Sequence, residues 1–242
     1  MPLVSPLRVL LALALLAGGS FGLYELVESP RTGAFEPVVT HGDGHVVALT
    51  YDDGPTRGVT DRVLDVLERE RVPATFFVVG RAARREPALL RRMRADGHEI
   101  ENHSDSHAHL NAIFSAHALD AELANAGDAI AAATGAHAHW LRPPFGARDA
   151  AVLDAARRHG LRVVLWSAML DETSPDAAPG ALAEKLLRQV GDGAIVVLHD
   201  GDAGRGDAGA RAYEAALTPL VIAALRARGY RFVTLDQLFA RK

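Results

Sequence analysis

Hydrophobic positions follow two alternating patterns from residue 46 to the end of the chain. Short apolar runs bounded by Gly, Pro or Asp predict buried strands, whereas longer segments with apolar residues three or four positions apart predict helices packed by one face. The predicted strands are residues 46–51, 74–80, 98–102, 139–141, 162–166, 194–198 and 230–235. The predicted helices are residues 60–71, 87–96, 115–134, 149–159, 178–190 and 211–228.

Strands that alternate with helices predict a parallel sheet with right-handed crossovers. About seven such units fit a deformed, TIM-like (β/α) barrel better than two separate domains. The chain carries no internal repeat. We therefore expect one α/β domain over residues 46–240, preceded by a connector at residues 25–45.

The N-terminus has a basic and then an apolar segment. Arg8 is followed by an uncharged, Leu- and Ala-rich run over residues 9–24, with small residues at positions 17–20. This pattern is typical of a secretory signal peptide. The run is slightly shorter than the ~20 residues that span a bilayer, so a short uncleaved anchor and a buried helix are alternatives. We expect residues 1–24 to direct the protein to the periplasm, cell envelope or extracellular space.

The amino-acid composition limits the kinds of partner, metal site and catalytic group that this chain can have. The 242 residues include 26 Lys+Arg and 30 Asp+Glu, and the net charge of −4 gives no reason to expect a nucleic-acid partner. There is no Cys, which excludes disulfides, thiolate metal sites, a cysteine nucleophile and lipoprotein anchoring. Any metal ligands must therefore come from the 11 His and from carboxylates.

Polar clusters follow the predicted strands at five places. The loops after the carboxyl ends of parallel barrel strands form the active-site face, so these clusters are expected to converge on one rim. They are Asp52-Asp53, His103 with His107, Arg142 to Gly146, Trp166 to Glu172, and His199-Asp200.

Two of these clusters suggest a metal site. Adjacent carboxylates at Asp52 and Asp53 repel each other, and a cation would relieve the repulsion, although Asp-Asp-Gly-Pro is also an ordinary turn. The spacing of His103 and His107 can place both rings on one side of a helical turn, although two surface histidines are the alternative. Two His and one Asp leave a coordination position open, as in catalytic zinc sites.

Two further residues have both a functional and an ordinary interpretation. Arg142 could clamp a carboxylate with both guanidinium nitrogens or form a surface salt bridge. His199 ends an apolar strand and could transfer protons or be an unremarkable rim histidine.

Four motifs together resemble those of a known family. TYDDGP (50–55), HSDSH (103–107), RPPFG (142–146) and VLHD (197–200) are similar to the motif series of polysaccharide deacetylases, the NodB-homology domains of carbohydrate esterase family 4. The resemblance covers residues 46–240. It implies a deformed barrel and a hydrolase that uses a divalent metal ion, commonly Zn²⁺, to remove acetyl groups from N-acetylated sugars.

The resemblance also implies a role for each matching residue. These roles are metal ligation by Asp53, His103 and His107; general-base catalysis by Asp52, oriented by Arg142; general-acid catalysis by His199; oxyanion stabilisation by the backbone N–H of Phe145; and lining of the acetyl pocket by Val197.

One motif departs from the family. Where relatives have Trp-Ser-x-Asp-x-x-Asp-Trp, this chain has Met169 in place of the first Asp and Thr173 in place of the last Trp. That Asp holds the catalytic His in relatives, and Asp171 or Glu172 could take over here. If neither does, Met169→Asp should raise the rate.

The sequence thus predicts an exported, monomeric, metal-dependent deacetylase of an acetylated polysaccharide or oligosaccharide, with membrane attachment only through the N-terminal segment. Peptidoglycan, chitin-like oligomers, secreted exopolysaccharide and acetylated xylan stay open as substrates, as does O- rather than N-deacetylation. A carbohydrate-binding envelope protein with low turnover and a hydrolase of small cyclic amides are the alternative functions.

Overall fold

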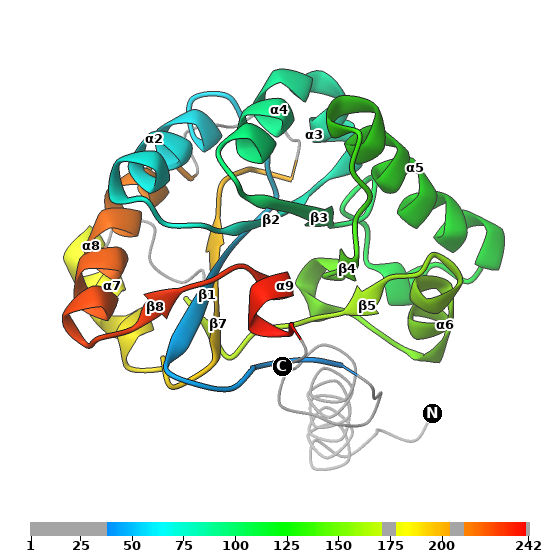
Figure 1. Ribbon diagram of the computed structural model, residues 1–242. Coiled ribbons are helices and arrows are strands. Elements are labelled where there is room, and N and C mark those ends of the chain that lie inside the picture. Colours follow the sequence, from blue (N-terminus) through cyan, green and yellow to red (C-terminus); the bar gives the residue numbers. More distant parts are fainter. Residues whose placement is uncertain (1–37, 171–177, 204–210, 241–242) are drawn as a thin grey trace, which may run out of the picture.

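The computed structural model describes residues 38–170, 178–203 and 211–240, which form one curved parallel sheet with helices around it (Figure 1). Seven strands lie in the order β5-β4-β3-β2-β1-β7-β6, and β8 pairs with the start of β1. The strands are β1 (Val46–Asp52), β2 (Thr75–Val78), β3 (Glu99–Asn102), β4 (Trp140–Leu141), β5 (Arg162–Val163), β6 (Ala168–Met169), β7 (Ala194–His199) and β8 (Arg231–Phe232). The strands curl into a half-barrel, which confirms the predicted deformed barrel.

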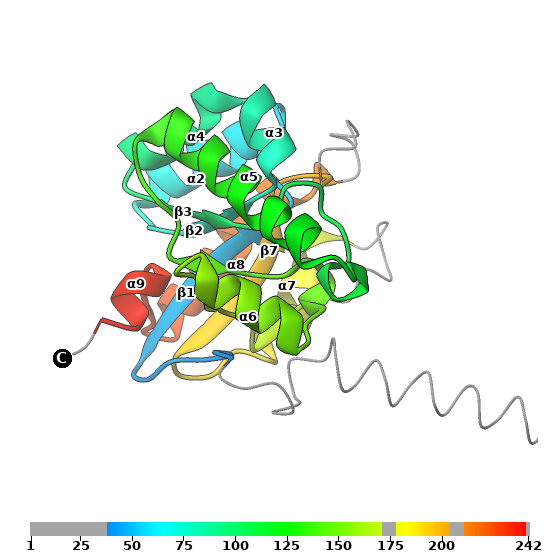
Figure 2. The same ribbon diagram turned by 90° about the vertical axis from the view of Figure 1, so that its right-hand side faces the viewer.

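Most of the helices cover the outer side of this half-barrel, whereas the last one packs against inward-facing residues of the sheet (Figures 1 and 2). Several begin at residues that satisfy their free N–H groups: the side chains of Ser115 and Asp149 accept hydrogen bonds from Ala118 and Val152, and Pro87 occupies a first turn. They are α2 (Thr60–Glu70), α3 (Gly80–Arg85), α4 (Pro87–Ala95), α5 (Ala116–Thr134), α6 (Ala150–Arg158), α7 (Pro179–Leu187), α8 (Glu214–Ala227) and α9 (Leu235–Leu238), with 3₁₀ turns η1 (Leu110–Ala112) and η2 (Pro144–Gly146).

The two faces of the central strands have different roles. Leu49 and Tyr51 of β1 pack with α2 and α8 in the main apolar core. Because side chains alternate along a strand, Thr50 and Asp52 point to the inside of the barrel. The same alternation on β7 places Val196 in the core and the neighbouring odd-numbered residues inside. The strands thus present polar residues to the interior of the half-barrel near their carboxyl ends.

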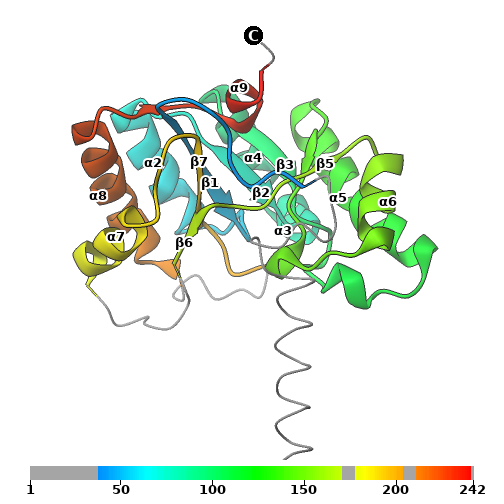
Figure 3. The same cartoon turned by 90° about the horizontal axis from the view of Figure 1, so that it is seen from below.

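Residues 162–166 do not form the single strand that the sequence predicts. Only Arg162 and Val163 belong to β5, and β6 begins at Ala168. These two strands lie at opposite edges of the sheet, so the chain between them crosses from one edge to the other (Figure 3). Val164 and Leu165 are buried along this crossing, where Val164 makes an isolated bridge to Val39, and the apolar pattern alone could not distinguish this from a continuous strand.

The structure also differs from the prediction at the last strand and after the second strand. The last strand ends at Phe232 rather than at residue 235, because Thr234 caps α9 in a capping box with Gln237. The short helix α3 lies where the sequence predicted the end of a strand and a loop. Its six residues are too few to show a helical repeat.

Part of the predicted connector belongs to the fold. Val39 bridges to Val164, His41 bridges to Ala194, and the backbone N–H of Gly42 donates to the carbonyl of Gly193 over 2.8 Å. The predicted signal or anchor at residues 1–24 lies outside the described residues. In the parts of the chain that the structure describes, no helix is long and apolar enough to cross a membrane.

Gly193→Ala is expected to destabilise the fold. Gly193 has φ +68°, and a Cβ there would lie 1.9 Å from the carbonyl oxygen of Gly42. We expect a loss of about 2–3 kcal/mol in the free energy of unfolding, measured by urea denaturation. Gly191→Ala is the matched control, because its Cβ would meet no atom within 4 Å. Equal stability of the two variants would contradict this account of the contact.

Candidate metal centre

The predicted site residues meet at the carboxyl ends of the strands. Asp52 ends β1, His199 ends the adjacent β7, and the two residues are paired in register. His103 follows β3 directly, and Arg142 follows β4 directly. Because all these strands run parallel, their ends lie on the same rim of the half-barrel.

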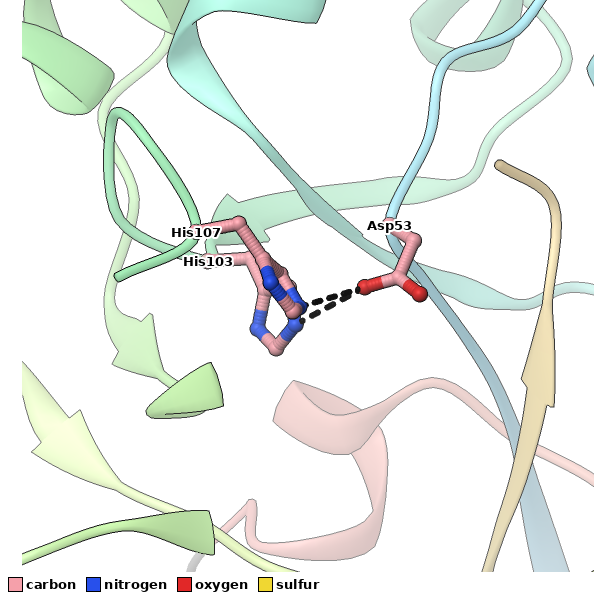
Figure 4. A group of neighbouring side chains, drawn as sticks. All are labelled: Asp53, His103 and His107. Carbon is pink, nitrogen blue, oxygen red and sulfur yellow. Dashed lines mark ion pairs between the residues drawn. The ribbon is translucent and has the colours of Figure 1, made fainter. Parts of the chain in front are cut away.

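Asp53, His103 and His107 form the candidate metal centre (Figure 4). Nε2 of His103 lies 3.3 Å from Oδ1 of Asp53, and Nε2 of His107 lies 2.9 Å from the same oxygen. One donor atom from each residue lies within 4.8 Å of the others. Such a His₂Asp donor set suits a divalent transition metal and leaves coordination positions open.

The hydrogen bonding of His103 also fits metal binding. Its Nδ1 is 2.7 Å from the carbonyl oxygen of Arg142. A carbonyl can only accept, so Nδ1 carries a proton, and Nε2 is the nitrogen that faces Asp53 and would bind a metal ion. A hydrogen bond of this kind orients a metal-ligating imidazole.

The loop that carries both histidines is not the helical turn that their spacing suggested. Ser104 and His107 have positive φ angles of 62° and 60°. The loop is held by side chains instead: Asn102 accepts from the backbone N–H of Ser104, the Ser104 hydroxyl accepts from the N–H of His107, and Glu122 accepts from the N–H groups of residues 105 and 106. Local side-chain bonds of this type compete successfully with helix formation.

The adjacent carboxylates face different partners. Asp53 has φ 73° and contacts the two histidines, whereas Asp52 contacts Arg142. Burial by itself would raise the pKa of Asp53, but the hydrogen bonds from His103 and His107 outweigh burial and hold the pKa well below its usual range. Asp53 is therefore a carboxylate at neutral pH, as a metal ligand must be.

Arg142 holds Asp52 in place. The buried guanidinium donates through NH1 to Oδ1 of Asp52 over 2.7 Å and to the hydroxyl of Thr50 over 2.8 Å. NH2 donates to the carbonyl of Leu165 over 3.1 Å. Arg142 and Asp52 thus form an ion pair, but not the bidentate clamp that the sequence suggested, because the second nitrogen binds the crossing segment instead.

The two predicted substrate-binding residues lie in different surroundings. Phe145 is 44% exposed, and its ring packs edge-on against His107 and stacks on His109 at 3.9 Å. Its backbone N–H donates no hydrogen bond to the described part of the chain, so this donor is available to a ligand. Val197 is buried and in register with Thr50 on β1.

The sequence missed one acidic neighbour of His199. Oε1 of Glu214 lies 3.9 Å from Nδ1 of His199 and accepts a hydrogen bond from its backbone N–H over 3.3 Å. Glu214 begins an apolar helix and belongs to no motif, so no sequence signal pointed to it. The candidates that the sequence suggested, Asp171 and Glu172, lie outside the described residues.

Backbone strain is concentrated around this site. Among the described residues other than glycine, six have positive φ, and all but Arg71, which ends α2, lie at the rim. A left-handed conformation costs such residues about 1–3 kcal/mol each and persists where the surroundings impose it, often at functional sites. The five at the rim are Asp53, Ser104, His107, Phe145 and Ala203.

Comparison with known proteins gives a consistent result. Residues 40–164 match the family model described as polysaccharide deacetylase. The chain is 37% identical to a chitooligosaccharide deacetylase from Sinorhizobium fredii, over 86% of this chain and 94% of that protein. It is 34% identical to the peptidoglycan-N-acetylglucosamine deacetylase PgdA of Listeria monocytogenes over 81% of this chain, but it spans only 39% of that longer protein.

A solved structure agrees with these sequence matches. The peptidoglycan deacetylase PdaC from Bacillus subtilis has a TM-score of 0.69 and 29% identity, over 82% of this chain and 90% of that one. The polysaccharide deacetylase resemblance and the fold that it implied are thereby confirmed.

We expect Zn²⁺ to raise the melting temperature of the wild-type protein, because an ion that binds only the folded state stabilises it. His103→Ala should abolish this increase, because it removes one of three ligands. His117→Ala is the matched control, since His117 is exposed on α5 outside the cluster. Differential scanning fluorimetry with and without Zn²⁺ measures the effect. A full increase in His103→Ala would contradict the assignment of the site.

Proposed function

The chain belongs to the polysaccharide deacetylase family, and on that premise we propose that it hydrolyses the N-acetyl groups of polymers or oligomers of N-acetylglucosamine. The observation that carries this proposal is the convergence of Asp53, His103 and His107 beside the Asp52–Arg142 ion pair. The names of the relatives support the substrate class, since one acts on chitooligosaccharides and the other on peptidoglycan N-acetylglucosamine.

Zn²⁺ is the ion that we propose for the centre, because three N and O ligands with an open position are its usual catalytic arrangement. When bound, such an ion polarises a carbonyl and lowers the pKa of a coordinated water. The residues of the chain supply the rest of the chemistry.

Proton transfer falls to two side chains on adjacent strands. Asp52, held by Arg142, accepts a proton from the attacking water. His199 then donates a proton to the leaving amine, which is otherwise a poor leaving group. The N–H of Phe145 donates to the oxyanion that develops on the amide oxygen.

A carbohydrate-binding role with low turnover is the alternative, and Met169 favours it, because it places an apolar side chain where the family has an Asp. The wild-type assay decides between the two functions. Acetate release from chitooligosaccharides or peptidoglycan that stops on chelation and returns with Zn²⁺ supports the enzyme. Binding of these glycans without any metal-dependent acetate release supports the alternative.

Export is a further part of the proposal. The basic and apolar pattern of residues 1–24 is typical of a signal peptide or short anchor, and peptidoglycan lies outside the cytoplasm. Fractionation of cells that express the full chain tests this, and recovery of the native protein only in the cytoplasm would contradict it.

Asp52→Asn is expected to lower kcat for deacetylation by about 10²–10⁴-fold, because it removes the general base. It should keep the metal, since Asp52 is not among the three ligands. Acetate release and metal content measured on the same sample separate the two effects. Asp128→Asn, on the exposed side of α5, is the control. Near-normal turnover of Asp52→Asn would show that another group is the base.

A further inference from the structure

Glu214 and His199 form a contact between α8 and the end of β7. Oε1 of Glu214 lies 3.9 Å from Nδ1 of His199 and accepts from its backbone N–H. Glu214 is only 1% exposed. Its second oxygen, Oε2, is buried and makes no hydrogen bond to the described part of the chain. A buried carboxyl with an unused oxygen beside an imidazole nitrogen is available as a hydrogen-bond partner of that ring.

In the described part of the chain, the neighbouring strand β6 consists of Ala168 and Met169 and carries no carboxylate. Met169 of β6 is in register with Val197 of β7. Side chains of paired residues in a parallel sheet point to the same face, and His199 lies two residues beyond Val197, so all three face the inside of the barrel. Met169 therefore faces the same side of the sheet as His199, one inward-facing position before it, and its thioether is at best a weak acceptor.

We propose that Glu214 is the positioning residue of His199. It binds Nδ1 and thereby directs Nε2 toward the rim where Asp52 and Asp53 lie. The inference rests on the proposed function. As the C–N bond of the substrate breaks, its electron pair goes to the amine nitrogen, which takes the proton from Nε2 of His199. Glu214 keeps the Nδ1 proton in place throughout. The contact of 3.9 Å must shorten during the reaction, as catalytic hydrogen bonds often do.

The charged groups around the pair are compatible with this role. Burial raises the pKa of Glu214 to about 8, while Arg211 has the opposite effect and Asp200 adds to the increase. Tyr213 precedes Glu214, and Asp53 interacts electrostatically with His199 from the metal side. Burial disfavours ionisation of the Glu214 carboxyl. An adjacent imidazolium favours its anionic form.

The first test compares two substrates, one whose leaving group needs a proton and one whose leaving group does not. The comparison separates a positioning role of Glu214 from general structural support. Glu214→Gln keeps the bond to the backbone N–H of His199 but weakens the acceptor for Nδ1. We expect kcat for chitooligosaccharide deacetylation to fall about 10- to 100-fold, part of what general-acid catalysis contributes. Hydrolysis of 4-nitrophenyl acetate, whose leaving group needs no proton, should change less than about threefold. Glu184→Gln on the exposed side of α7 is the control.

The second test uses Met169→Asp. If Glu214 already serves His199, this substitution brings no gain in the otherwise wild-type chain, whereas in the Glu214→Gln background it restores part of the lost amide hydrolysis. A clear gain in the otherwise wild-type chain, or equal losses of Glu214→Gln on the amide and the ester, would overturn the proposal.

A measurement without turnover distinguishes failure of this inference from failure of the proposed function. The Nδ1 proton of His199, assigned by its loss in His199→Gln, should give a downfield NMR signal that moves upfield in Glu214→Gln, because an amide oxygen is the weaker acceptor. An unchanged signal would overturn the proposal. A wild-type protein that shows this response but releases no acetate would refute the proposed function and leave the Glu214–His199 pairing established.

Discussion

The buried guanidinium of Arg142 connects the parts of this site. One nitrogen binds Asp52 and Thr50 of β1, and the other binds Leu165 in the segment that crosses between the sheet edges. The backbone carbonyl of the same residue accepts from Nδ1 of His103 and so orients a metal ligand. Burial of a charge in this way is costly unless it is paired and hydrogen-bonded. The ring of Phe77 stacks beneath the guanidinium at 4.1 Å, and these contacts together make its position well defined.

The surrounding backbone is held in conformations that it would not adopt alone. Asp53, Ser104 and His107 are left-handed, and they lie in the segments that carry the two carboxylates and the two imidazoles. The compensating interactions come from Asn102 and Glu122, which bind the backbone N–H groups of the histidine loop. The strain and its compensation together preorganise the ligands before any ion binds, which lowers the cost of forming the site.

In the proposed pairing of Glu214 with His199, a side chain from a different element takes the place of the missing one. A carboxylate on β6 would be separated from His199 by one strand spacing, whereas Glu214 reaches it from the first turn of α8. What the general acid requires is an acceptor near Nδ1 and not a particular place in the chain. A motif that is incomplete in the sequence can therefore be complete in space.

The sequence by itself determined the alternation of strands and helices, the α/β class of the fold and the three residues of the candidate metal centre. These features follow from local periodicity and from motifs of a few neighbouring residues. Three features were decided only by the tertiary structure. The run at residues 162–166 is a crossing rather than one strand, Arg142 contacts Asp52 through one nitrogen, and Glu214 lies beside His199. Each depends on which distant segments pack together, and contacts between residues far apart in the chain leave no periodic pattern in a single sequence.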